Sequence, residues 1–199
     1  MLTATAILAS NTSSFPPEEL ARGLARPEQF LITHFWNAPH TVPLVEVVGC
    51  AQMKEDLIEQ VMHWLTDIGN EPVRLGKFTA GFIGNRIQCA VLREAVHIVN
   101  EGAATPQDVD KVVRATLGRR YPYAVPFEVA DAGGLPTFLA VSTHLLPELA
   151  DNASLDSLLA QFREKVDQGR TGQRSGQGFS RLDRGIIACI CAAPQGGAG

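Results

Sequence analysis

The sequence predicts a small α/β unit followed by an all-α unit, with a boundary near residue 77. Two apolar segments rich in β-branched residues, Phe30 to Trp36 and Pro43 to Val48, are separated by a turn-rich stretch and predict neighbouring strands. Beyond Lys77 the apolar residues recur at helical spacing nearly to Val166. The 199 residues are 45% hydrophobic and 19% charged, which is enough apolar material for one or two packed domains.

Four further elements complete the first unit. Residues 5 to 10 predict a buried strand that ends in a polar loop. Residues Glu18 to Leu24 predict a short helix with acids in its first turn. From Ala51 to Ile68, apolar residues three and four apart predict an amphipathic helix, and Glu71 to Leu75 predict a brief strand.

The second unit is predicted from helix patterns and a helix start. Residues Phe82 to Asn100 are apolar over a wide arc, so we expect a central helix that is buried on several sides. Thr105 to Asp108 places a hydroxyl at the N-cap, a proline at the first helical position and an acid in the first turn. Further helices are expected at Phe127 to Asp131, Pro136 to Leu149 and Leu155 to Val166, the last N-capped by Ser154. Residues 167 to 185 predict a loop, and 186 to 199 a disordered tail.

Charge and hydropathy exclude several classes of protein. The net charge is −4 and is spread without a long run of one sign, which gives no broad attraction for nucleic acid or an anionic membrane. The longest wholly apolar stretch, Ile186 to Ala193, is far shorter than the roughly 18 to 20 residues of a membrane span. We therefore expect a soluble, cytoplasmic protein that binds neither nucleic acid nor membrane.

The basic and aromatic stretch Arg119 to Tyr123 is expected to line a substrate entrance or a subunit contact.

The cysteines and most histidines do not form a recognisable site. The four cysteines, which are Cys50, Cys89, Cys189 and Cys191, contain no CxxC pair, so we expect reduced thiols. The close pair near the C-terminus is read as incidental rather than reactive. The remaining histidines do not cluster with acids or thiols at ligand spacing, and we assign no metal; they are His40, His63, His97 and His144.

A histidine and a glutamate lie on the two predicted strands. His34 is on the first strand and Glu46 on the second, and a hairpin centred near His40 places them opposite each other. Paired residues have Cβ atoms about 4.5 to 5.5 Å apart, so the carboxylate can accept the imidazole N–H. The spacing indicates either a general base with its orienting acid or a surface histidine beside an unrelated strand acid.

Four motifs carry a family resemblance. They are Asn11-Thr12-Ser13-Ser14, His34-Phe35-Trp36-Asn37, Pro43-Leu44-Val45-Glu46-Val47-Val48 and Gly81-Phe82-Ile83-Gly84-Asn85-Arg86. Together they resemble the L-3-hydroxyacyl-CoA dehydrogenase family, especially members that act on short substrates. The resemblance continues through Glu101 to Asp110, Pro126 to Glu128 and Gly176 to Phe179, and it covers roughly residues 7 to 180.

The resemblance implies a reaction and a set of residues. The reaction is the NAD-dependent oxidation of a 3-hydroxyacyl-CoA to a 3-ketoacyl-CoA in fatty acid metabolism. The family's catalytic histidine falls on His34 and its orienting glutamate on Glu46, while Ser13 and Asn85 would hold the substrate oxygen. Without the resemblance, Ser13 is an ordinary loop serine and Asn85 a polar residue at a helix start. Contacts with the cofactor are implied for Asn11, Ser13 and Asn37.

The resemblance also implies a fold and a partner. We expect an α/β remnant of a Rossmann domain over residues 1–77, followed over residues 78–185 by an all-α C-terminal helical domain that pairs two subunits in a homodimer. The family's N-terminal half is expected to be missing, with Met1 just before the last parallel strand of the nucleotide-binding sheet. None of the eighteen glycines forms the GxGxxG that seats a pyrophosphate, so a truncated cofactor domain is expected.

Two other functions stay open. One is a non-catalytic helical dimerisation module that has inherited its site residues. The other is a dehydrogenase of a non-CoA 3-hydroxy acid, since dehydrogenases of gulonate and carnitine share the neighbourhood around His34 and Glu46.

Overall fold

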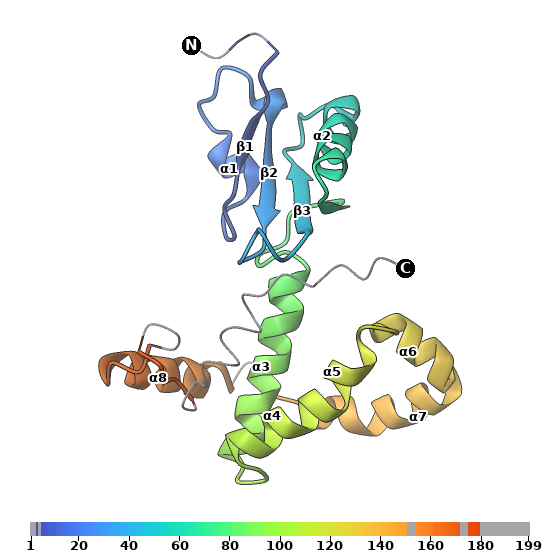
Figure 1. Ribbon diagram of the computed structural model, residues 1–199, viewed down its shortest axis with the longest axis vertical. Helices are drawn as coiled ribbons and strands as arrows, with labels where there is room; N and C mark the ends of the chain where they lie inside the picture. Colours follow the sequence, from blue (N-terminus) through green and yellow to red (C-terminus); the bar gives the residue numbers. More distant parts are fainter. Residues whose placement is uncertain (1–2, 4, 151–153, 172–174, 180–199) are drawn as a thin grey trace. The chain divides into compact units, whose positions relative to one another are not determined.

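The computed structural model describes residues 3, 5–150, 154–171 and 175–179. It divides into two compact units, of which the first runs to Gln88 and the second begins at Cys89. The elements are β1 (Leu8–Ser10), α1 (Pro17–Leu20), the 3-10 turn η1 (Pro27–Gln29), β2 (Phe30–Phe35), β3 (Leu44–Gly49), α2 (Glu55–Asp67), β4 (Glu71–Arg74), α3 (Gly84–Asn100), α4 (Pro106–Ala115), α5 (Leu117–Arg120), α6 (Pro126–Gly133), α7 (Leu135–Leu145), η2 (Leu146–Glu148) and α8 (Ser154–Asp167) (Figure 1). The division falls inside α3, and the expected domain boundary near residue 77 stays a prediction.

The described residues of the first unit form a four-stranded mixed sheet in the order β1-β2-β3-β4. Strand β1 is parallel to β2, β2 is antiparallel to β3, and β3 is parallel to β4. The predicted pair of neighbouring strands is therefore confirmed as an antiparallel hairpin. The predicted strand at residues 71 to 75 is confirmed as β4.

Helices cover both faces of this sheet, α2 on one side and α1 on the other (Figure 1). Because side chains alternate along a strand, Val45 and Val47 of β3 belong to the core under α2, while Val48 belongs to the opposite core. The opposite core also contains Ile32 and Phe82. His34 lies two residues beyond Ile32, and Glu46 two before Val48, so both point to the face that Phe82 covers.

Two predictions for the first unit need correction. The strand expected to be buried over residues 5 to 10 is shorter, and Leu8 is 38% exposed. The reason is its place at the edge of the sheet, where in the described part of the chain it pairs with β2 alone. The helix expected to Leu24 is a single turn that ends at Leu20, before Gly23 adopts a left-handed φ of 85°.

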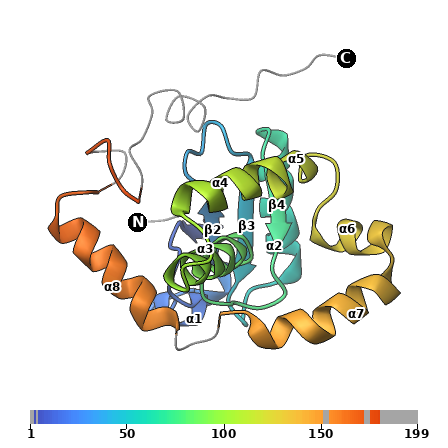
Figure 2. The same cartoon turned by 90° about the horizontal axis from the view of Figure 1, so that it is seen from below.

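The described residues of the second unit, which begins at Cys89 within α3 and includes α8, form helices, as predicted. The N-cap prediction is confirmed, because the Thr105 hydroxyl accepts the backbone N–H of Asp108 at 3.2 Å. Helices α6 and α7 follow one another around a turn at Gly134 (Figure 2). No helix of the described ranges is long and apolar enough to cross a membrane. The predicted tail at 186–199, with Cys189 and Cys191, lies outside the described residues.

The expectation that α3 is buried on several sides is wrong. Val96 is its buried residue, whereas Ile87 and Val91 are exposed. A wide apolar arc becomes buried only when other helices pack on it from several directions. Among the residues of α3, all of them described, Val96 alone is buried, and its neighbours from 92 to 99 are partly exposed.

Candidate active site

The His34 and Glu46 side chains form a buried pair across the hairpin. The register of β2 and β3 places the two residues directly opposite each other, as the sequence predicts. His34 Nδ1 and Glu46 Oε2 are 3.0 Å apart, and the two residues are 5% and 1% exposed. The alternative of a surface histidine beside an unrelated acid is therefore wrong.

The Glu46 carboxylate is held by donors on both of its oxygens. Besides His34, the Trp36 indole N–H donates to Oε2 at 3.1 Å. The backbone N–H groups of Ile83 and Gly84 donate to Oε1 at 2.7 and 3.1 Å. Burial alone would raise the pKa of Glu46, but the hydrogen bonds from His34, Gly84, Trp36 and Ile83 outweigh it and hold the pKa below its ordinary value. Glu46 is therefore a fixed negative charge.

The charge on Glu46 determines the tautomer of His34. An ionised carboxylate only accepts hydrogen bonds, so Nδ1 of His34 must carry the proton that faces Glu46. In the neutral ring Nε2 is then an acceptor, and Ser13 Oγ lies 3.1 Å from it and donates its hydroxyl proton. Ser13, His34 and Glu46 thus form a continuous hydrogen-bonded chain with a basic nitrogen at its centre.

Phe82 fixes the plane of the imidazole. Its ring is fully buried and stacks on His34, with the two centroids 4.7 Å apart and the planes 12° from parallel. Phe78 packs edge-on against Phe82, with the ring centroids 5.9 Å apart. Phe82 has a left-handed φ of 52°, which is unfavourable for a bulky side chain and is maintained here by this packing.

A cavity of about 370 Å³ opens beside the pair. Its lining joins the end of β2 to the start of α3 and consists of Ser13, His34, Phe35, Trp36, Asn37, Asn85 and Gln88. Four of the sequence-predicted residues, Ser13, His34, Asn37 and Asn85, therefore meet at one cavity. Asn11 is not among its lining residues, and its side-chain oxygen instead accepts the backbone N–H of Phe35 at 2.9 Å. That bond ties the loop after β1 to the end of β2.

Sequence reasoning assigned no role to Trp36, Phe82, Ile83 and Gly84. Trp36 and Phe82 stand in motifs that carry the resemblance, but a backbone N–H or a stacked ring leaves no signature in a sequence. The glycine at position 84 is itself visible in the sequence, and the structure explains why it is needed: a Cβ built there would lie 2.0 Å from the Trp36 ring. Only glycine allows the start of α3 to approach that indole.

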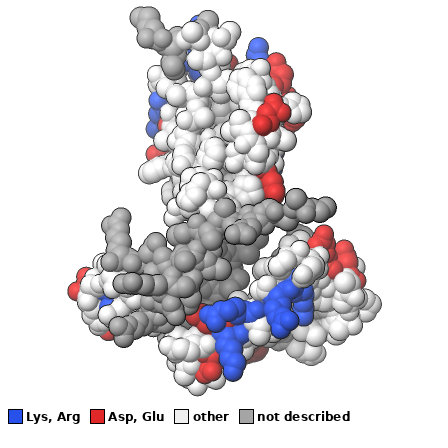
Figure 3. Space-filling view, viewed as in Figure 1, with Lys and Arg blue, Asp and Glu red and all other residues white. Residues whose placement is uncertain are grey.

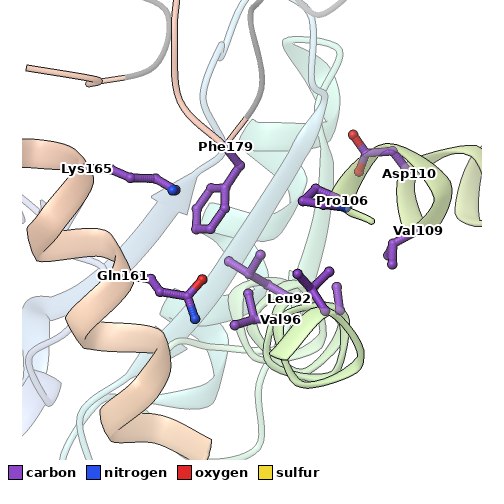
Figure 4. Close-up of a pocket in the computed structure, with 10 residues that line it drawn as sticks. Leu92, Val96, Pro106, Val109, Asp110, Gln161, Lys165 and Phe179 are labelled. Atoms are coloured by element: carbon purple, nitrogen blue, oxygen red, sulfur yellow. The ribbon is translucent and has the colours of Figure 1, made fainter. Parts of the chain in front are cut away.

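Other cavities lie away from this pair. A cavity of about 330 Å³ in the second unit is lined mainly by apolar side chains of α3 and α4, together with Gln161 and Lys165 of α8 and Phe179 (Figure 4). None of the predicted site residues lines it. Basic side chains also gather on one face of the second unit (Figure 3), and Arg119, Arg120 and Tyr123 line an open pocket. Their expected role at a substrate entrance or subunit contact stays a prediction.

The residues around the cavity fit the reacting end of a nicotinamide dinucleotide. His34 Nε2 faces a space of ligand size with the polar side chains of Asn37 and Asn85 around it. The chain contains no GxGxxG to seat the pyrophosphate, so the fit is limited to the reacting end. Among the residues that the structure describes, no group of three or more His, Cys, Asp or Glu side chains is placed to hold a metal ion.

A mixed sheet carries a hydrogen-bonded Glu–His pair at a polar cavity and is followed by a helical unit, which is the arrangement that the family resemblance implies. Residues 1–78 match the model for the NAD-binding domain of 3-hydroxyacyl-CoA dehydrogenase, and residues 81–182 match the model for its C-terminal domain. The chain belongs to the 3-hydroxyacyl-CoA dehydrogenase family. Its N-terminal match is to an NAD-binding domain, so the cofactor is NAD, as the sequence predicts.

The chain is similar to several dehydrogenases that are longer than it is. It is 38% identical to a probable 3-hydroxybutyryl-CoA dehydrogenase of Deinococcus radiodurans, over 87% of this chain and 60% of the relative. It is 31% identical to 5-formyl-3-hydroxy-2-methylpyridine 4-carboxylate 5-dehydrogenase of Mesorhizobium japonicum, over 87% of this chain and 55% of the relative. A crystal structure of a dehydrogenase of that second kind, described as an NAD+ dependent dismutase, superposes with a TM-score of 0.79 at 26% identity, over 94% of this chain and 65% of the other. The chain thus spans less than two thirds of the length of these proteins.

Proposed function

We propose that this chain supplies the proton-transfer residues for NAD-dependent oxidation of a 3-hydroxyacyl-CoA to a 3-ketoacyl-CoA. The observation that carries the proposal is the hydrogen-bonded chain from Ser13 through His34 to Glu46, with distances of 3.1 and 3.0 Å, at a polar cavity. Family membership supports this reaction class. The particular acyl group stays open.

In the proposed mechanism, His34 acts as the general base. Nε2 takes the proton of the substrate hydroxyl while Nδ1 keeps its proton toward Glu46. The ionised Glu46 stabilises the imidazolium that forms, and its filled hydrogen-bonding capacity means that it orients His34 without taking the proton itself. In the reverse direction, the imidazolium returns the proton to the carbonyl oxygen.

Ser13 and Asn85 hold the substrate oxygen in this proposal. Ser13 Oγ already occupies a hydrogen-bonding position on Nε2, and the Asn85 amide lines the same cavity. NAD, when bound, supplies the hydride acceptor. Asn37 lines the cavity and is proposed to contact the cofactor, whereas the bond from Asn11 to Phe35 supports a positioning role for Asn11 in the loop.

We further propose that residues 78–185 form the family's helical domain and join two copies of the chain in a homodimer. The support is the large amount of apolar surface on α6 and α7, where Phe127 and Leu139 are 87% and 70% exposed. The cytoplasmic location expected from the sequence stays a prediction.

A dehydrogenase of a non-CoA substrate is the second candidate. It is favoured by the sequence and structural similarity to the pyridine-carboxylate dehydrogenases, which are named for a substrate without CoA. The proton-transfer roles of His34 and Glu46 are the same in both cases. A non-catalytic dimerisation module is the third candidate.

The test is a fluorescence titration of the purified chain with NADH, followed by an assay of acetoacetyl-CoA reduction. Because the chain has no GxGxxG to seat the pyrophosphate, we expect NADH binding that is weak but saturable. We expect the activity to fall about 100-fold or more in His34→Ala, since general acid–base catalysis contributes about 10²–10⁴-fold. The exposed helix residue His63 offers a matched control, and His63→Ala should keep the activity. No NADH binding at millimolar concentration would favour the dimerisation module, and unchanged activity in His34→Ala would remove His34 from the reaction.

A further inference from the structure

We propose that Trp36 is a positioning residue, whose indole N–H keeps Glu46 aligned behind His34 and whose ring fixes the wall of the adjoining cavity. The inference rests on the proposed function, because it concerns the histidine to which that function assigns the proton. Its physical basis is independent of catalysis.

Glu46 Oε2 accepts hydrogen bonds from two side chains. One is the His34 imidazole at 3.0 Å, and the other is the Trp36 indole at 3.1 Å. Oε1 is occupied by the backbone N–H groups of Ile83 and Gly84. A carboxylate bound through both oxygens has one orientation that satisfies all these donors. Trp36 is the donor that secures the oxygen facing the imidazole.

Trp36 is itself held in place by the start of α3. A Cβ at Gly84 would lie 2.0, 2.8 and 2.9 Å from three atoms of the indole ring, so the ring packs directly against that backbone. Gly84 also donates its N–H to Glu46. The same short segment therefore positions the indole and the carboxylate together.

Trp36, which donates to Glu46, is also part of the wall of the cavity that is proposed to take the substrate. Trp36 lines the cavity together with Ser13, His34 and Asn85. Phenylalanine at this position keeps a flat aromatic ring but removes the donor to Oε2. Trp36→Phe should therefore loosen the carboxylate and ease its protonation while leaving the fold intact.

The two tryptophans of the chain provide the experiment and its control. Trp64 lies on α2 and is half exposed, whereas the Trp36 indole N–H is bonded to a buried carboxylate. In NMR spectra of the full chain, we expect slow hydrogen exchange for the Trp36 indole and fast exchange for Trp64. In Trp36→Phe, the titration of the Glu46 carboxyl carbon should move to higher pH, and in Trp64→Phe it should stay in place.

Fast exchange at the Trp36 indole, or an unmoved Glu46 titration in Trp36→Phe, would overturn the inference. The exchange measurement uses the unmodified protein, so it holds even if the variant folds poorly. Neither readout requires cofactor or turnover. A failure here is thus distinct from a failure of the NADH and acetoacetyl-CoA tests. Where activity is present, kcat in Trp36→Phe should fall up to about 100-fold, the size expected for a misplaced catalytic group.

Discussion

Glu46 is a buried charge that the protein stabilises with donors rather than with a cation. A buried carboxylate is costly unless its oxygens are hydrogen-bonded, and both of them are, through two side chains and two backbone N–H groups of the described residues. These bonds lower the pKa of Glu46 despite its burial. A charge held in this way contributes to stability as well as to the orientation of His34.

The lowered pKa predicts how stability depends on pH. Because the folded pKa of Glu46 lies below the ordinary value of 4.5, its contribution is present above pH 4.5 and is lost as the pH falls through the folded value. We expect Glu46→Gln to lower the free energy of unfolding at neutral pH by about 1.5–3 kcal/mol, the range for hydrogen bonds to a charged group. The variant should also lack part of the acid dependence of the unmodified chain.

Urea unfolding followed by circular dichroism between about pH 6 and pH 3 measures both effects. Glu71 is an exposed carboxylate of the same sheet, and Glu71→Gln should change stability by less than about 0.5 kcal/mol. Equal acid dependence in Glu46→Gln and the unmodified chain would show that folding does not lower the pKa of Glu46, and it would contradict this prediction.

Sequence reasoning predicted the pairing of His34 with Glu46 because a short hairpin and a period of two determine which residues meet. It missed the donors from Ile83 and Gly84, which lie 37 and 38 residues from Glu46. No local pattern specifies where a distant backbone N–H will point. The imidazole partner was thus predictable, while the groups that hold its carboxylate were not.

At the scale of elements, the contact between the hairpin and the start of α3 is the feature on which the site depends. Trp36 follows β2, and Gly84 begins α3. The close approach leaves no room for a side chain at Gly84. Adding even a methyl group at Gly84 should therefore displace the Trp36 ring and disturb the site.

We expect Gly84→Ala to destabilise the protein by about 1–3 kcal/mol, the usual cost of inserting a methyl group into filled space. A Cβ at Gly84 meets the Trp36 ring at 2.0 Å, whereas a Cβ at Gly76 meets nothing within 4 Å, so Gly76→Ala is the matched control. Thermal unfolding gives the melting temperatures of the two variants, and we expect that of Gly84→Ala to be the lower. Equal melting temperatures would mean that the indole moves aside freely.

Element types were predicted well, and their lengths and burial less well. The N-cap at Thr105 and the strand at Glu71 follow from local chemistry, which a sequence displays. The exposure of β1 and of much of α3 depends on which neighbours surround them, and periodicity alone does not reveal that.

In the molecule as a whole, the described part of the second unit exposes several large apolar side chains. The exposed apolar side chains of α6, α7 and the following turn include Phe127, Leu135, Leu139, Val141 and Leu146. Large exposed apolar patches mark interaction sites, and these side chains are the basis of the proposed interface. The proposed partner is a second copy of the chain.

We expect the unmodified chain to be a dimer and Leu139→Asp to shift it toward the monomer, because a buried unpaired carboxylate opposes association. Leu139 is 70% exposed in the single chain. Ile68 is 72% exposed on the first unit, so Ile68→Asp serves as the control. Light scattering after size-exclusion chromatography gives the masses. A monomeric unmodified chain, or a dimer unaffected by Leu139→Asp, would contradict the proposed interface.

The role of His34 as a base depends on which of its ring nitrogens carries the proton, and the ¹⁵N chemical shifts of the neutral ring measure this. We expect a proton on Nδ1, which faces Glu46 at 3.0 Å, and a bare Nε2 toward Ser13 and the cavity. A proton on Nε2 with a bare Nδ1 would contradict it, because His34 could then accept no proton from a substrate in that cavity.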